Sequence, residues 1–164
     1  MSKIITREII EKILEQIPDP EIPVISIVDL GIVRDIILDG QKVIVNITPT
    51  YSGCPAMMAI QNDIVSRLKE EGIDEVEVRL VFDEVWTTDW IHEEAKERLR
   101  VYGIAPPEKS SQDKSLITGK PRIVNCPRCG SSNTSVVSQF GSTACKALYR
   151  CEDCREPFDY FKCH

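Results

Sequence analysis

Hydrophobic residues in the first half of the chain recur with two periods, that of a helix and that of a strand. Isoleucine and leucine at helical spacing fill residues 4–17, and Pro18 ends the pattern because it lacks an N–H donor. The segment VISIVDLGIVRDIILDG (24–40) predicts a loop followed by a strand, and its final Asp39-Gly40 is typical of a hairpin turn. Residues 41–50 then predict an antiparallel return strand, with Val43, Val45 and Ile47 on one face.

The next stretch predicts a helix, a strand and a helix. Apolar residues at helical spacing follow Cys54 and stop near Gly72. The alternating segment 74–82 predicts a strand parallel to the preceding one, because a helix crosses over between them. Residues 87–103 predict a helix that Thr87 or Thr88 caps and that ends at Gly103.

The pattern then changes. Residues 104–121 are polar, contain prolines and lack periodicity, which is typical of a linker. Residues 122–164 are too few to build a core of their own and need a metal or a cross-link. We therefore expect an α+β domain at 1–104 with three helices and a mixed three-stranded sheet, a linker at 105–121 and a small stapled module at 122–164.

The staple is a set of cysteines with metal-ligand spacing. Two Cys-x-x-Cys turns, at 126–129 and 151–154, each point two sulfurs at one ion, and together they complete a tetrahedron. The pattern predicts a structural zinc ribbon, with a rubredoxin-type iron as the alternative metal. The predicted ligands are Cys126, Cys129, Cys151 and Cys154.

The residue after each turn differs. Gly130 suits the left-handed backbone that such turns often need, whereas Arg155 in the same place is expected to be strained. Among the other cysteines of the tail, Cys145 is expected to pack in the module. We assign no ligand role to the terminal Cys163 and His164.

Composition and charge indicate the cellular compartment in which the protein works. The net charge is −6, and residues 1–105 hold eleven Lys and Arg against twenty Asp and Glu. No run approaches the roughly 20 apolar residues of a membrane span, and the N-terminal stretch lacks the pattern of a signal peptide. Seven cysteines then favour metal binding over disulfides. We expect a cytoplasmic protein with no membrane partner.

Two segments carry a family resemblance. DPEIPVISIVDLGIV (19–33) and TYSGCPAM (50–57) resemble the iron–sulfur-assembly family that includes the SufT and PaaD proteins. Residues 86–107 and the cysteine-bearing tail are similar to the PaaD members in particular. The resemblance implies a non-catalytic accessory factor that matures metal centres of the multicomponent phenylacetyl-CoA epoxidase, a monooxygenase of phenylacetate breakdown. The implied client centre is its di-iron site or its [2Fe–2S] cluster. The implied partners are subunits of that enzyme and iron–sulfur assembly proteins.

The resemblance also selects a site. Cys54 and Asp29 match positions associated with assembly, and the surrounding loop contains Thr48, Ser52 and Gly53. Tyr51 departs from the expected pattern, as does the pair Met57-Met58.

The chemistry of Cys54 also favours a role in iron binding. A thiol at a helix start meets unpaired N–H groups that lower its pKa, and a thiolate is a soft ligand for iron. Cys54 is thus expected to hold iron or an iron–sulfur cluster transiently. One cysteine cannot hold a cluster alone, so a partner or a second copy, in a homodimer, would contribute.

Two other functions fit part of the sequence. The basic tail could make the chain a nucleic-acid-binding regulator, but the zinc–thiolate charge of −2 would leave the module only weakly positive. Cys54 could serve a thiol redox reaction, but no second cysteine or histidine lies near it in sequence. Phosphate-binding glycine loops and nucleophile elbows are absent, so we do not expect an enzyme.

Overall fold

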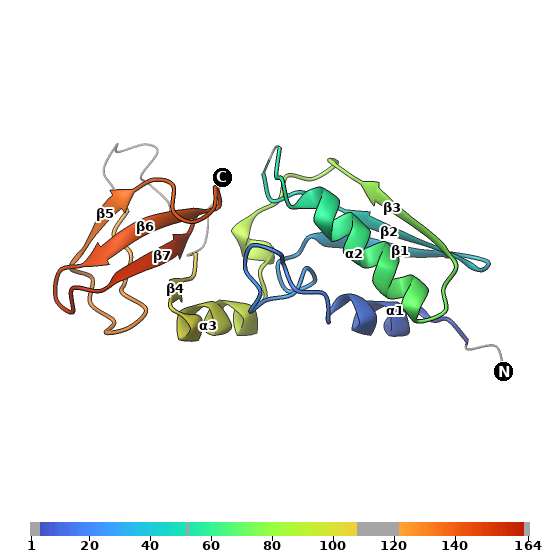
Figure 1. The fold of residues 1–164 in the computed structure, drawn as a ribbon, viewed down its shortest axis with the longest axis horizontal. Helices are drawn as coiled ribbons and strands as arrows, with labels where there is room; N and C mark the ends of the chain where they lie inside the picture. Colours follow the sequence, from blue (N-terminus) through green and yellow to red (C-terminus); the bar gives the residue numbers. More distant parts are fainter. Residues whose placement is uncertain (1–3, 52, 108–121, 163–164) are drawn as a thin grey trace. The chain divides into compact units, whose positions relative to one another are not determined.

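The computed structural model describes residues 4–51, 53–107 and 122–162 (Figure 1). Its contacts divide the chain into two compact units, Met1–Trp86 and Thr87–His164. The predicted α+β class is confirmed, and none of the described helices combines the length and apolar content needed to cross a bilayer.

The first unit contains a three-stranded sheet with two helices. The sheet has the order β1-β2-β3, where β1 (Val33–Asp39) is antiparallel to β2 (Lys42–Ile47) and β2 is parallel to β3 (Glu75–Leu80). Helix α1 (Arg7–Leu14) precedes the sheet, and α2 (Met57–Glu70) makes the crossover from β2 to β3 (Figure 1). This is the mixed sheet that the sequence predicts.

The core of this unit follows the two periods of the sequence. Val43, Val45 and Ile47 of β2 are almost fully buried, which confirms the face predicted for this strand. From the helices, one face of α1 and the residues Ile60, Ile64 and Leu68 of α2 are also buried. Gly40 has a φ of 63°, as the hairpin turn requires.

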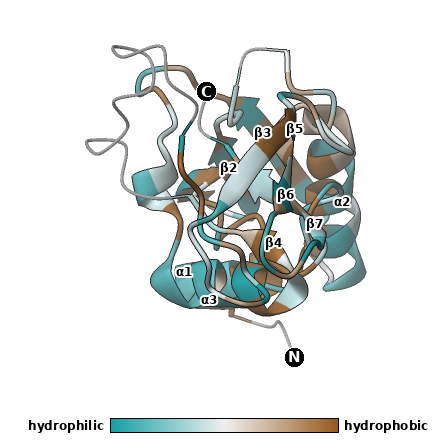
Figure 2. Ribbon diagram, turned by 90° about the vertical axis from the view of Figure 1, so that its left-hand side faces the viewer, coloured by the Kyte–Doolittle hydropathy of each residue, from teal (hydrophilic) through white to brown (hydrophobic). Residues whose placement is uncertain are grey.

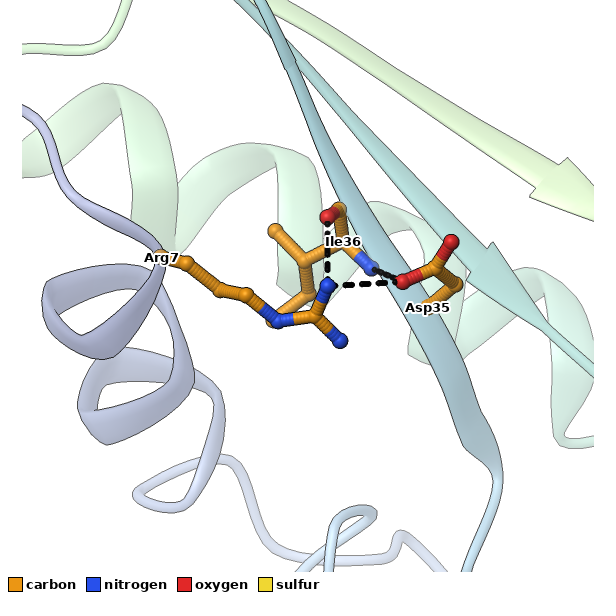
Figure 3. A network of polar contacts seen from close by, with 3 residues as sticks. All are labelled: Arg7, Asp35 and Ile36. Atoms are coloured by element: carbon orange, nitrogen blue, oxygen red, sulfur yellow. Dashed lines mark hydrogen bonds and ion pairs between the residues drawn. The ribbon is translucent and has the colours of Figure 1, made fainter.

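An ion pair joins α1 to β1 (Figure 3). Arg7 Nη1 lies 3.0 Å from Asp35 Oδ1 and donates to the backbone oxygen of Ile36 at 3.3 Å. The β1–β2 register shifts between Val33 and Asp35, so the ion pair lies just after a bulge. Both side chains are about half exposed, and this pair therefore orients the helix more than it stabilises the fold.

The second unit is a four-stranded sheet preceded by two short helices. The sheet order is β4-β7-β6-β5, with β4 parallel to β7 and the other neighbours antiparallel. The elements are η1 (Thr88–Trp90), α3 (Glu93–Tyr102), β4 (Ile104–Ala105), β5 (Thr134–Ser138), β6 (Lys146–Cys151) and β7 (Pro157–Phe161). Figure 2 shows α3 as mainly hydrophilic, and only its Ala95 and Leu99 are buried.

The prediction of one helix over 87–103 is wrong in its first turn. Thr87 caps the 3₁₀ helix η1 by accepting from the N–H of Asp89, and Ile91 and His92 are extended before α3 begins at Glu93. The predicted end of the helix is confirmed, because Gly103 adopts a φ of 99°.

The division between the units falls before α3, earlier than the domain boundary expected at residue 104. Helix α3 contacts β4, and β4 pairs with β7, so both elements group with the second unit. Ala105 falls in the linker expected from the sequence, whereas the structure places it in β4, paired with Tyr160. Most of the expected linker, residues 108–121, lies outside the described residues.

Candidate functional site

Two tight turns bring the four predicted metal ligands together. In the first turn, the N–H of Gly130 donates to the oxygen of Cys126 at 2.9 Å, and Gly130 has a φ of 76°. In the second turn, Arg155 has a φ of 62° and is the one non-glycine residue with positive φ in the described chain. The left-handed backbone predicted after each turn is confirmed, and Arg155 takes it without the freedom of glycine.

The four sulfurs have the spacing of a tetrahedral zinc site. The Sγ atoms of Cys126, Cys129, Cys151 and Cys154 all lie within 4.8 Å of one another. The Cys126–Cys154 and Cys129–Cys151 sulfur pairs are 3.8 Å and 3.5 Å apart. Zinc–sulfur bonds of ~2.3 Å at tetrahedral angles place sulfurs ~3.8 Å apart. Both the donor set and the spacing therefore fit a structural zinc ion.

The thiols of the cluster differ in pKa: the pKa of Cys151 is lowered, whereas burial and the neighbouring sulfurs raise the pKa of Cys154 to about 12 and the pKa of Cys129 is also raised. The backbone N–H groups of Cys154 and Asp153 point at the sulfur of Cys151 and lower the pKa of this thiol to about 7, against a smaller opposing effect of desolvation. Metal ligation by cysteine requires the thiolate, so these N–H groups favour binding. The bound metal would have four protein ligands, and a closed site of this kind is structural.

Cys145 does not join this cluster. Cys145 is buried, and its sulfur lies 3.1 Å from the Thr143 hydroxyl. The packing role expected for Cys145 matches this position. Cys163 and His164 lie outside the described residues.

The second candidate centre is the loop that contains Cys54. The N–H of Cys54 donates to the oxygen of Tyr51 at 3.3 Å, and Gly53 turns the chain with a φ of 76°. Helix α2 begins only at Met57, with Ala56 as its N-cap, so Cys54 precedes the helix by a turn. Ser52, which the sequence places in this loop, lies outside the described residues.

The expectation that the helix start lowers the pKa of Cys54 is wrong. Burial is the largest influence and raises the pKa of this thiol, and the carboxylates of Glu21 and Asp19 raise it further. The N–H of Ala56 and the hydroxyl of Tyr51 act in the opposite direction without reversing the shift. The resting side chain is a thiol because the loop is half-buried and one helix N–H does not offset the lost water.

The acidic neighbours of Cys54 come from the proline-rich turn. Asp19 is buried, and its Oδ1 accepts from the N–H groups of Glu21 and Ile22 at 2.8 Å each. An isolated bridge between Pro18 and Ser26 closes this segment. The effect of these carboxylates on Cys54 is not predictable from the sequence, because nothing local to either segment indicates that the fold brings them together.

Asp29 and Thr48 hold backbone in place. Asp29 Oδ2 accepts from the N–H of Ser26 at 3.0 Å, and the Ser26 hydroxyl accepts from the N–H of Asp29 at 3.1 Å. Thr48 is buried, and its N–H donates to the oxygen of Ile32 at 2.9 Å. The carboxylates that act on the Cys54 thiol are Glu21 and Asp19, whereas the Asp29 carboxylate binds the backbone of its own turn.

Comparison with known families divides the sequence into two matches. Residues 7–80 match the family described as "Iron-sulfur cluster assembly protein", and residues 110–162 match the "PaaD zinc beta ribbon domain". The first match contains Cys54 and its acidic turn, and the second contains all four clustered cysteines.

Two solved structures share the fold of the first match. A domain of unknown function from Bacillus anthracis has a TM-score of 0.53 and 29% identity, covering 56% of this chain and 89% of that one. A conserved hypothetical protein from Thermotoga maritima has a TM-score of 0.52 and 37% identity, covering 60% and 98% of the two chains.

Two relatives carry functional names. A protein of Porphyromonas gingivalis named as an "Fe-S protein maturation auxiliary factor" is 37% identical, over 55% of this chain and 87% of its own. A protein of Escherichia coli K12, named as a candidate component of 1,2-phenylacetyl-CoA epoxidase, is 53% identical over 92% of this chain and 89% of its own. With both family matches, this similarity shows that the chain belongs to the PaaD family, which joins an iron–sulfur cluster assembly domain to a zinc ribbon.

Proposed function

We propose that the protein is a non-catalytic accessory factor that helps to mature an iron centre of a phenylacetyl-CoA epoxidase. The observation that carries the proposal is the half-buried Cys54 thiol beside the carboxylates of Asp19 and Glu21, inside the iron–sulfur assembly domain. The name of the Escherichia coli relative supports this client enzyme. The client centre is its di-iron site or its [2Fe–2S] cluster.

The surroundings of Cys54 suit a transient ligand. Iron must displace the proton of a thiol before it binds, and a raised pKa makes that displacement less favourable at neutral pH. Nearby carboxylates attract the cation and provide oxygen ligands during its approach. A site of this kind takes iron or a cluster when a partner supplies the other ligands, and releases it readily. The partner is one of the client's subunits, an assembly protein or a second copy in a homodimer.

The zinc ribbon has a separate task in this proposal. A zinc ion with four cysteine ligands has no open position for a substrate, so the ribbon holds structure and docks to the client. Among its described aromatic residues, Tyr149, Phe158, Tyr160 and Phe161 are buried, and Phe140 alone is exposed, so the ribbon does not present a row of rings for stacking on bases. This burial favours protein docking over the nucleic-acid alternative. Four of the ribbon's cysteines are grouped as metal ligands, which favours a reducing compartment and hence the cytoplasm.

The test compares Cys54→Ser with Cys145→Ser in a strain that lacks the native gene. Serine nearly keeps the volume of cysteine, so we expect Cys54→Ser to change the free energy of unfolding by no more than about 1 kcal/mol. This variant should keep its zinc but fail to restore epoxidase activity, and the client should lack iron. Cys145→Ser should restore both.

Iron content measured separately in the oxygenase and reductase subunits identifies the client centre. Full activity with Cys54→Ser, at normal iron content in both subunits, would contradict the proposed role of the thiol.

A further inference from the structure

A cavity of about 560 Å³ lies within the second unit, beside the first cysteine turn. Its walls come from the end of α3, from β4 and the prolines after it, and from residues 122–130. Three arginines line it, namely Arg100, Arg122 and Arg128, and no carboxylate is among its described lining residues. This size is that of small-molecule sites, which span roughly 300–1,000 Å³.

The fold anchors Arg122, whereas Arg128 is exposed. Arg122 Nη1 donates to the Tyr160 hydroxyl at 2.8 Å, and its guanidinium lies 5.8 Å from the centre of the Tyr160 ring. Arg128 lies against the C-cap of α3, where a Cβ on Gly103 would meet its Nη2 at 3.5 Å. In the described part of the chain no carboxylate forms an ion pair with Arg128.

The third arginine contributes less. Arg100 is bound by Glu97 through two nitrogens, with its Nε 2.9 Å from Oε2. Zinc with four thiolates adds a charge of about −2, which Arg122 and Arg128 offset. A ligand would therefore be selected by the directed N–H groups of the guanidinium forks, and only weakly by the overall field.

Much of the remaining wall is apolar, although Asn125 also lines the cavity. Ala105 and Val124 are buried beneath it, and Pro106, Pro107 and Pro127 lie around them. A ligand that fills the cavity thus needs an anionic end for the guanidinium groups and a body that tolerates an apolar wall. Guanidinium forks match phosphate oxygens two at a time.

We propose that this pocket binds the phosphate groups of a small organic phosphate of nucleotide size. Arg128 and Arg122 bind the phosphate oxygens, and the proline-lined wall contacts the rest of the ligand. The pocket is partly open to solvent, and its volume lies in the range of small-molecule sites, which favours a small molecule over an acidic surface of another protein.

Titration calorimetry on the zinc-loaded full chain tests this proposal with pyrophosphate, ADP and coenzyme A as probes. ADP or coenzyme A should bind with a Kd below ~1 mM, and pyrophosphate more weakly. Tighter binding of coenzyme A than of ADP would assign the wall to the pantetheine arm, and equal binding would assign recognition to the nucleotide diphosphate.

Three variants separate the pocket from general charge. Arg128→Gln and Arg128→Lys should each weaken ADP binding about tenfold, since neither keeps the fork. Arg150→Gln, an exposed arginine of the same unit outside the pocket, should leave it unchanged. Zinc content is measured for every variant, so loss of the fold is detected directly.

The proposal is overturned if no probe binds, if Arg150→Gln weakens binding as much as Arg128→Gln, or if pyrophosphate binds as tightly as ADP and coenzyme A. Binding of an oligoglutamate peptide in place of all three phosphates would likewise overturn it, in favour of a protein partner.

Discussion

The four clustered cysteines and Cys54 show two ways in which a sequence builds a thiol site. Each pair of cluster ligands comes from one tight turn, and the turn geometry alone aims both sulfurs at one ion. Cys54 depends instead on a distant segment, since the carboxylates that shape its chemistry belong to the turn around Asp19. The spacing of cysteines in the sequence therefore predicts the geometry of the metal site reliably. The reactivity of a single thiol depends instead on tertiary packing, which the local sequence does not give.

The same contrast applies to stability. The second unit has a small aromatic core around Tyr149, Phe158 and Tyr160, and it includes two of the metal ligands, Cys126 and Cys151. The first unit buries apolar faces of two helices and a sheet, and its described residues contain no cluster of structural metal ligands. Metal loss should consequently affect the units unequally.

The largest expected effect is that of Cys151→Ser. Cys151 is fully buried, and structural zinc contributes on the order of 10 kcal/mol to folding in small modules. We expect this variant to lose its zinc and the order of β5, β6 and β7, while the first unit keeps its amide resonances. Zinc analysis and NMR of the labelled chain measure both results.

Cys145→Ser is the matched control, because this cysteine is buried in the same unit but lies outside the cluster. It should keep one zinc per chain. An ordered second unit in metal-free Cys151→Ser would remove the contrast between the two units.

A smaller effect concerns pH and Cys54. Because its pKa is raised, alkylation of Cys54 should be slow at neutral pH and should accelerate with pH until the thiolate predominates. Glu21→Gln removes one of the carboxylates that raise this pKa and should increase the rate severalfold at a fixed pH. Peptide mapping by mass spectrometry follows Cys54 alone, and Glu11→Gln on α1 should leave its rate unchanged.

The same shift has a consequence for stability. A thiol whose pKa is raised by folding stabilises the fold fully below its unfolded pKa, and this contribution is lost as pH rises through the folded pKa. Cys54→Ser should abolish that alkaline loss in the first unit. A Cys54 that reacts at neutral pH as fast as an exposed cysteine would show that packing does not control this site.

The smallest effect compares the residues after the two cysteine turns. Arg155→Gly should stabilise the second unit by about 1 kcal/mol, since glycine adopts positive φ without the steric cost. Gly130→Ala should destabilise it by a similar amount, because a Cβ there meets no neighbour and only the backbone is strained. Thermal unfolding of the zinc-loaded chain measures both changes, and equal responses to the two substitutions would refute the assigned strain.

Elements with regular periods were predictable from the sequence. The alternation in β2 gives its buried face, Gly40 gives the hairpin, and the two Cys-x-x-Cys turns give the cluster. The 3₁₀ helix η1 was not predictable. The two extended residues after it interrupt a sequence whose polar and apolar spacing otherwise continues as one helix.

The chemistry of Cys54 was also beyond local reasoning. The sequence places this cysteine near a helix start, but its burial and the influence of the Asp19 turn on it depend on how loops pack. Strand β4 is only two residues long and precedes consecutive prolines, so no periodic signal could reveal it.

Strand β4 also determines where a stable fragment of this protein can begin. The PaaD zinc-ribbon match begins at residue 110, after β4, yet the backbone of β7 pairs with Ile104 and Ala105. A fragment starting at residue 110 would contain every zinc ligand but would leave the β7 edge bare at Asp159 and Tyr160. Bare strand edges promote association between chains. A fragment made for study in isolation should therefore begin before η1, so that both α3 and β4 are retained.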